Sequence, residues 1–113
     1  MRTVILLLVS IVAAAALAVP VTAATRANTL TATVGPGFNI SMNKKTVTAG
    51  TYVIVVHDKS SIHNFHFLGR GVGKTTSVVG IGTSHWTVKL KKGTYKFVCD
   101  PHAAIMHGLL KVT

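Results

Sequence analysis

From about residue 28 onward the chain consists of short runs in which apolar and polar residues alternate, separated by glycine or polar turns. Alternation with a period of two is typical of strands that bury one face. In residues 84–90, Trp86, Val88 and Leu90 share one face, and His85, Thr87 and Lys89 share the other. Seven or eight such runs with no helical pattern among them predict an all-β fold, an antiparallel β-sandwich with Greek-key connections.

Two of these runs differ from simple alternation. Residues 51–57 are almost continuously apolar, which predicts a central strand covered on both faces. Residues 62–68 are a strand or extended segment, followed by a glycine-rich loop over residues 69–73 and a short strand near residues 75–79.

The first 24 residues have the composition of a signal peptide. Arg2 precedes an apolar run over residues 4–19, which is too short to cross a bilayer comfortably, and small residues follow at Ala23 and Ala24. We expect cleavage near these alanines, with an uncleaved membrane anchor as the alternative. In either case residues 25–113 form a single exported domain, in the periplasm, at the cell surface or outside the cell.

The chain is strongly basic, with a net charge of +10 at pH 7 and only two acidic residues, Asp58 and Asp100. Such a charge attracts acidic redox proteins or an anionic membrane surface. Nucleic acid is excluded as a partner because the aromatic residues do not interleave with the basic ones. We expect the domain to act as a monomer.

Three side chains suited to soft metals lie within eight residues of each other: Cys99, His102 and Met106. Cys99 is the only cysteine, so the chain has no internal disulfide. A thiolate, a thioether and two imidazoles suit copper that cycles between its two oxidation states, and His63 is the candidate for the second imidazole. Zinc, or no metal at all, remains an alternative.

Strand alternation tests this assignment independently. Cys99 shares a face with Tyr95 and Phe97, and His63 shares the face of two neighbouring phenylalanines, so both proposed ligands point toward the core. His66 falls on the opposite face. We interpret it, together with His57 and His85, as a structural or surface residue.

The two segments His63-Asn64-Phe65 and Cys99-x-x-His102-x-x-x-Met106 resemble the blue copper proteins, or cupredoxins, of the plastocyanin, amicyanin and pseudoazurin kind. The resemblance implies one mononuclear type 1 copper ion. It makes His63, Cys99 and His102 the equatorial ligands and Met106 the axial ligand. It also implies that Asn64 joins the two ligand loops by a hydrogen bond.

The loop departs from the family pattern, because the spacing between His102 and Met106 lies between those of plastocyanin-like and amicyanin-like proteins. This departure leaves His107 open as an alternative axial ligand.

The resemblance implies an electron carrier that shuttles one electron between redox partners. His102 would lie nearest the surface, and an apolar rim formed by Gly35, Pro36, Gly69 and residues 103–105 would receive the partner. We expect no enzyme, since the sequence offers neither an acid pair nor a nucleophile with its base. The alternatives are a carrier or buffer that delivers copper and, last, a metal-free adhesion module.

Overall fold

The computed structural model describes residues 13–16 and 28–113. The predicted signal peptide, residues 1–24, and its boundary with the domain therefore lie outside the described residues, apart from 13–16, which have no regular secondary structure. No helix in the described part of the chain is long and apolar enough to cross a membrane.

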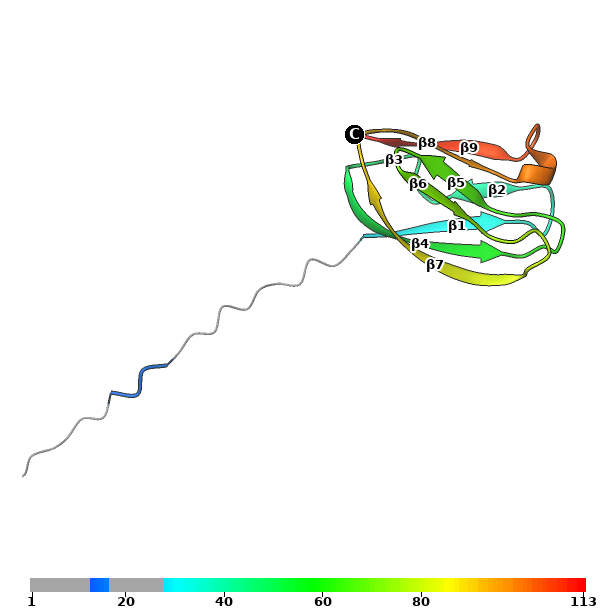
Figure 1. Ribbon diagram of the computed structural model, residues 1–113. Coiled ribbons are helices and arrows are strands. Elements are labelled where there is room, and N and C mark those ends of the chain that lie inside the picture. Colours follow the sequence, from blue (N-terminus) through cyan, green and yellow to red (C-terminus); the bar gives the residue numbers. More distant parts are fainter. Residues whose placement is uncertain (1–12, 17–27) are drawn as a thin grey trace, which may run out of the picture.

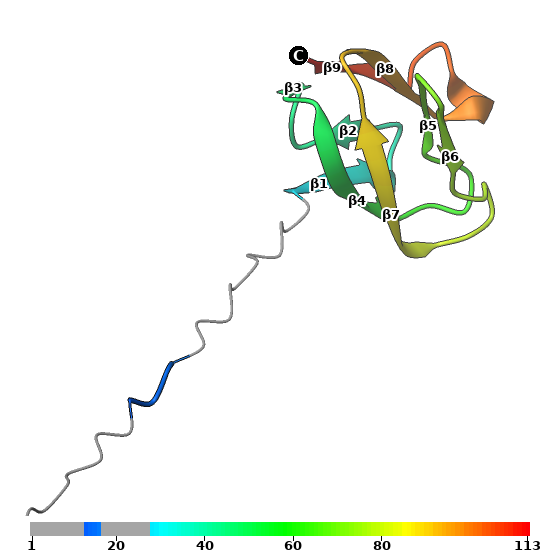
Figure 2. The same ribbon diagram turned by 60° about the vertical axis from the view of Figure 1, so that its left-hand side comes forward.

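Residues 28–113 form two sheets packed face to face (Figures 1 and 2). In spatial order, the first sheet consists of β2 (Ile40–Met42), β1 (Asn28–Val34), β4 (Gly50–Asp58) and β7 (Gly82–Leu90). The second consists of β3 (Thr46–Val47), β9 (His107–Val112), β8 (Gly93–Val98), β5 (His66–Gly69) and β6 (Val72–Thr75). A single 3₁₀ turn, η1 (Asp100–His102), follows β8. The prediction of an all-β sandwich is confirmed.

The sheets are mixed rather than purely antiparallel. β1 pairs with β4 in parallel, and β3 pairs with β9 in parallel, whereas the other pairs are antiparallel. The chain leaves β1, returns through β2, crosses to the second sheet as β3 and re-enters the first sheet as β4, so β1 and β4 run in the same direction. Alternation identifies strands but does not give their direction, and the antiparallel prediction was wrong for these two pairs.

Three predicted elements also differ. β4 buries only alternate side chains, those of Tyr52, Ile54, Val56 and Asp58, because no second layer among the described residues covers its outer face. β5 begins only at His66, since residues 59–65 form a loop. β6 begins at Val72 instead of near residue 75, because Gly71 adopts a φ of 77° that turns the chain within the glycine-rich segment.

Aromatic side chains of β5 and β8, together with Phe65 just before β5, form much of the core between the layers. Phe67 stacks on Tyr95 with ring centroids 5.4 Å apart, and Phe65 stacks on Phe97 at 5.5 Å. All four side chains and Cys99 are buried. The predicted inward face of β8 is therefore confirmed.

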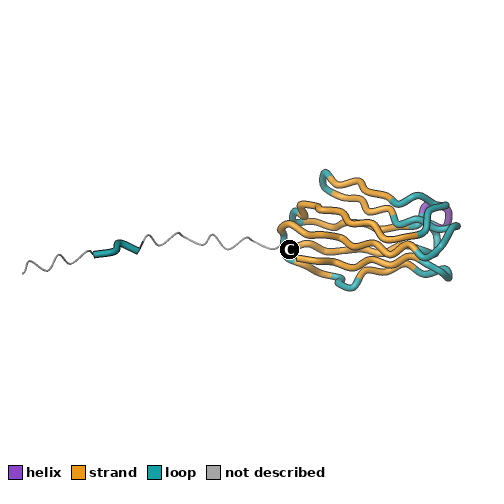
Figure 3. The backbone as a smooth tube through the Cα atoms, turned by 90° about the horizontal axis from the view of Figure 1, so that it is seen from below, coloured by secondary structure: helices purple, strands orange, loops and turns teal. Residues whose placement is uncertain are grey.

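The strand register places four loops at one end of the sandwich. Val34 pairs with Asp58, Asp58 with Gly82, and Val98 with both His66 and His107. The loops that follow or precede these residues cover 35–39, 59–65, 76–81 and 99–106, and we call this the Cys99 end. Figure 3 shows loops gathered at both ends of the strands, and the far end contains the start of β1 and the turn at residues 91–92.

Candidate metal centre

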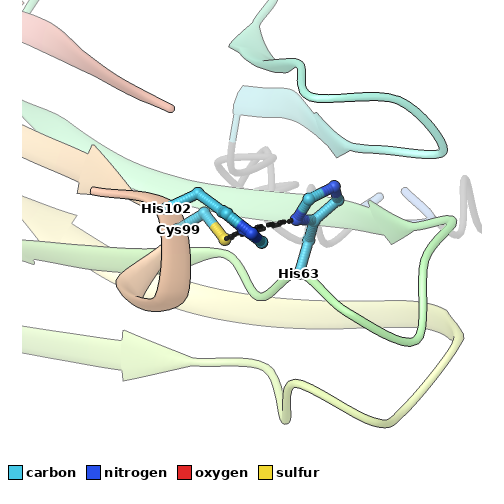
Figure 4. A group of neighbouring side chains, drawn as sticks. All are labelled: His63, Cys99 and His102. Carbon is cyan, nitrogen blue, oxygen red and sulfur yellow. Dashed lines mark hydrogen bonds between the residues drawn. The ribbon is translucent and has the colours of Figure 1, made fainter. Parts of the chain in front are cut away.

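The side chains of His63, Cys99 and His102 converge at the Cys99 end (Figure 4). The Nδ1 atoms of the two histidines lie 3.0 Å apart. Cys99 Sγ lies 3.6 Å from His63 Nδ1 and 3.7 Å from His102 Nδ1. The structure thus brings together three predicted ligands, although His63 is 36 residues before Cys99 in the chain.

The loop that contains Cys99 and His102 is closed by its own backbone. Cys99 N–H donates to the carbonyl of Met106 at 3.0 Å, and Met106 N–H donates to the carbonyl of His102 at 2.9 Å. Pro101 occupies the first turn of η1, where its missing N–H costs no hydrogen bond. The loop is therefore compact, and it holds the thiol and the imidazole on the same side.

The loop of His63 is held by the buried carboxylate of Asp58. This carboxylate accepts hydrogen bonds from Ser60 N–H and from Thr76 Oγ1, both at 3.1 Å, and Thr76 Oγ1 in turn accepts the N–H of Phe65 at 2.8 Å. The sequence analysis gave no role to Asp58 or Thr76. The one available signal was an acidic residue at the end of a strongly apolar strand.

Gly35 makes room for this loop. A Cβ atom on Gly35 would lie 2.7 Å from the Cβ of Ser60, and the φ of 72° at Gly35 disfavours any side chain. The loop before β2 can therefore pack directly against the loop of His63.

Asn64 joins the two loops. Its Nδ2 donates to Asp100 Oδ2 at 2.7 Å, and Asp100 N–H donates to Asn64 Oδ1 at 2.8 Å. Asn64 is buried, and its amide also reaches Thr75 Oγ1. The predicted hydrogen bond between the ligand loops is confirmed, with Asp100 as the partner that sequence reasoning did not identify.

His66 supports the same bridge, as its Nδ1 lies 3.0 Å from Asp100 Oδ2. The hydrogen bond from Asn64, followed by the hydrogen bond and charge of His66, holds the pKa of Asp100 below its ordinary value against an opposing effect of burial. Asp100 thus stays ionised and continues to accept both hydrogen bonds.

The donor set fits a metal ion. Bond lengths of about 2.0–2.3 Å, typical of imidazole nitrogen and thiolate sulfur, separate the ligand atoms around one ion by roughly 3–4 Å. The three donor atoms have this separation, and both His63 and Cys99 are fully buried. Within the described residues His63 Nε2 has no hydrogen-bond partner. A metal bond at Nδ1 would offset the cost of burying this imidazole.

Met106 completes the set on the same side. It lies opposite Cys99 across the β8–β9 pair, so the two side chains share a face, and Met106 is fully buried in the core. His107 is opposite Val98 and exposed. The structure therefore favours Met106 over His107 for the axial position, and each coordination bond stays a prediction.

Phe38 packs against both histidines. Its ring centroid lies 5.2 Å from that of His63 and 5.0 Å from that of His102, edge to face in both cases, while 61% of its surface remains exposed. The alternation of Phe38 with Ile40 and Met42 predicts that all three share one face of a strand. That strand begins only at Ile40, so Phe38 belongs to a loop and covers the site instead.

Exposed apolar side chains share the Cys99 end with the partly exposed His102. Five large exposed apolar side chains occupy the loops of the Cys99 end: Phe38, Ile62, Val79, Ile81 and Ile105. The predicted rim is correctly placed for Gly35, Pro36 and residues 103–105. It is wrong for Gly69, because β5 runs away from the site and Gly69 packs on Tyr95 toward the far end.

Comparison with known proteins agrees with this site. The profile of the family described as copper binding proteins, plastocyanin/azurin family, matches residues 16–113. No curated protein sequence matches the chain.

Several solved structures share the fold. A rusticyanin variant is 23% identical over 75% of this chain and 76% of its own, with a TM-score of 0.58. Reduced auracyanin from Roseiflexus castenholzii is 20% identical over 77% and 98%, with a TM-score of 0.55. Auracyanin A from Chloroflexus aurantiacus, described as a "blue" copper protein, is 17% identical over 78% and 100%, with a TM-score of 0.55. At these identities the likeness concerns the fold.

The family profile covers the whole of the described sandwich, and the donors in the sandwich are those that suit copper. His63, Cys99 and His102, with Met106, form a site of the type 1 copper kind. The chain belongs to the plastocyanin/azurin family of copper-binding proteins.

Proposed function

We propose that this protein carries single electrons between larger redox partners. A copper ion bound by a thiolate and two imidazoles supplies one-electron cycling between its cuprous and cupric states. The observation that carries the proposal is the burial of the donor set. His63, Cys99 and Met106 are fully buried, and of the four donors only His102 reaches the surface.

The surrounding residues keep the donors in place. Asn64 and Asp100 connect the two loops, and the buried carboxylate of Asp58 holds the loop of His63. Groups that are already positioned need little rearrangement when the charge at the site changes. This rigidity supports electron transfer, which is slowed by rearrangement.

The path to the partner runs through His102. Large exposed apolar side chains commonly mark a protein–protein contact. Five of them lie in the loops of the Cys99 end, and Phe38 is packed over both imidazoles. Docking there would bring a partner's redox centre close to the one donor that reaches the surface.

A carrier fits this site better than an enzyme does. Catalytic metals keep an open coordination position for water or substrate. Here Met106 shares the buried face of Cys99, and the donors lie beneath Phe38, so the surroundings leave little room for a substrate.

Location and partners are proposed from the sequence. The leader supports export, cleaved or retained as an anchor, and the net charge of +10 supports acidic redox partners or contact with an anionic membrane surface. We propose that the domain acts as a monomer.

Voltammetry of the copper-loaded domain, residues 25–113, tests the electron carrier against copper delivery. An electron carrier gives a reversible one-electron wave and retains copper when a cuprous chelator is added to the reduced protein. Rapid transfer of copper from the reduced protein to the chelator would instead identify a copper carrier. A Cys99→Ser variant serves as the control, because it removes the thiolate and should abolish the reversible wave.

A further inference from the structure

β6 and β7 are edge strands of the two sheets and lie on the same side of the sandwich (Figure 2). A groove lies between them. Its volume is about 480 Å³. One wall comes from residues 70–74 and the other from residues 87–89 and Lys91. The groove lies away from the copper site, so the proposed redox role does not account for it.

Four basic side chains line the groove: Arg70, Lys74, Lys89 and Lys91. All four are exposed, and no acidic residue lines the groove. The two acidic residues of the chain, Asp58 and Asp100, lie at the Cys99 end. The positive charge in the groove therefore has no neutralising partner in its walls, and it should attract an anionic ligand.

Arg70 is held in place before any ligand arrives. Its Nη1 donates to the carbonyl of Lys92 at 2.7 Å. Its side chain also lies against Gly93, where an added Cβ atom would be 2.9 Å from Arg70 Cδ. A positioned side chain loses less conformational entropy on binding than a free one.

The backbone along the groove is also accessible. β6 pairs only with β5, and β7 pairs only with β4, so within the described residues each has an outer edge without a strand partner. Space is open around Gly71 and Gly73. A free edge can accept an extended peptide as an additional strand. Lysines along an edge repel a second copy of the same basic chain, but they attract an acidic one.

We propose that the groove between β6 and β7 binds an extended acidic segment of a protein partner. The basic side chains contact the carboxylates, and the free edge of β7 hydrogen-bonds with the backbone of the segment. A flat lipid surface cannot enter a groove in this way. The proposal concerns binding alone and stands independently of the redox role.

Titration of the reduced copper-loaded domain with a short peptide that alternates acidic residues and valine tests the proposal by NMR. We expect shifts of the backbone amides of β6 and β7. Binding should be about tenfold weaker in the double variant Lys74→Gln/Lys89→Gln, as two partly exposed ion pairs are lost. It should also weaken as salt is added.

The matched control is Lys45→Gln/Lys111→Gln, which removes the same charge outside the groove and should change the affinity little. A peptide of the same charge with N-methylated backbone should also bind more weakly. The proposal would be overturned if both double variants lost the same affinity for the peptide, or if the amide shifts were spread over all the lysines. Either result would show that net charge alone attracts the peptide. Tighter binding of inorganic polyphosphate at the same amides would assign the groove to a phosphate ligand instead.

Discussion

Asn64 and Asp100 exchange two hydrogen bonds, one from Asn64 Nδ2 to Asp100 Oδ2 at 2.7 Å and one from Asp100 N–H to Asn64 Oδ1 at 2.8 Å. Asn64 follows His63, and Asp100 follows Cys99, so this bridge ties together the two loops that carry all of the donors. The geometry of the site therefore depends on a pair of residues that need not touch the metal.

Replacing Asn64 with alanine should loosen the site. The change leaves the N–H of Asp100 without its acceptor and removes the Nδ2 donor to Asp100 Oδ2, which costs about 1–3 kcal/mol of unfolding free energy. Chemical denaturation of the metal-free domain measures this loss. Asn43→Ala is the control, because Asn43 Oδ1 accepts a hydrogen bond from Thr31 N–H at an exposed position remote from the metal donors. An Asn64→Ala domain as stable as the control would contradict the role of the bridge.

Acid should weaken the same bridge. The pKa of Asp100 is lower in the folded than in the unfolded chain, so its contribution is present above the unfolded pKa and is lost as the pH falls through the folded value. The metal-free domain should thus lose stability below about pH 4. Asp100→Asn should reduce this loss. Because the side chain of Asp100 is 53% exposed, the difference should be modest. If the stability of the unaltered domain and that of Asp100→Asn varied identically with pH, Asp100 would not be the source of the acid sensitivity.

Phe38→Ala should open the site without unfolding the domain. Phe38 is 61% exposed, so truncation should cost less than about 1 kcal/mol, but it uncovers the imidazoles of His63 and His102. We expect faster copper removal by a chelator and a shifted reduction potential. Leu109→Ala removes an equally exposed apolar side chain outside the Cys99 end and should change neither. Equal behaviour of the two variants would show that Phe38 does not shield the site.

Met106→Leu tests the axial position. The swap keeps the volume of the side chain and should cost less than about 1.5 kcal/mol. Loss of the thioether should raise the reduction potential, because the more highly charged cupric state gains more from an additional donor. His107→Leu should leave the potential unchanged, since His107 is exposed opposite Val98. The reverse result would make His107 the axial ligand.

The sequence located the donors and, through the family resemblance, one of their supports, Asn64, but not the partners that hold the loops in place. The inward side of Cys99 follows from the alternation with Tyr95 and Phe97, which the structure confirms. His63 was also placed inward correctly, but a loop held by Asp58 positions it rather than a strand. Hydrogen bonds between residues distant in sequence leave no periodic signal, so the networks of Asp58 and Asp100 could not be predicted.

The same limit applies to the fold. Alternation identified most strands, but the parallel pairing of β1 with β4 depends on how the chain crosses between the sheets. Phe38 lies two residues before β2 and continues its apolar alternation, so the sequence does not distinguish a buried position from one over the site. Gly69 lies at the end opposite to the predicted rim because β5 runs away from the site. The local sequence does not reveal the direction of β5.

The most direct test is the visible absorption spectrum of the domain, residues 25–113, after one equivalent of cupric ion is added. A thiolate from Cys99 on copper should give an intense charge-transfer band that ascorbate bleaches and reoxidation restores, and the Cys99→Ser variant should lack it. Only weak ligand-field absorption in the unaltered domain, or release of copper on reduction, would contradict a redox copper centre at His63, Cys99 and His102.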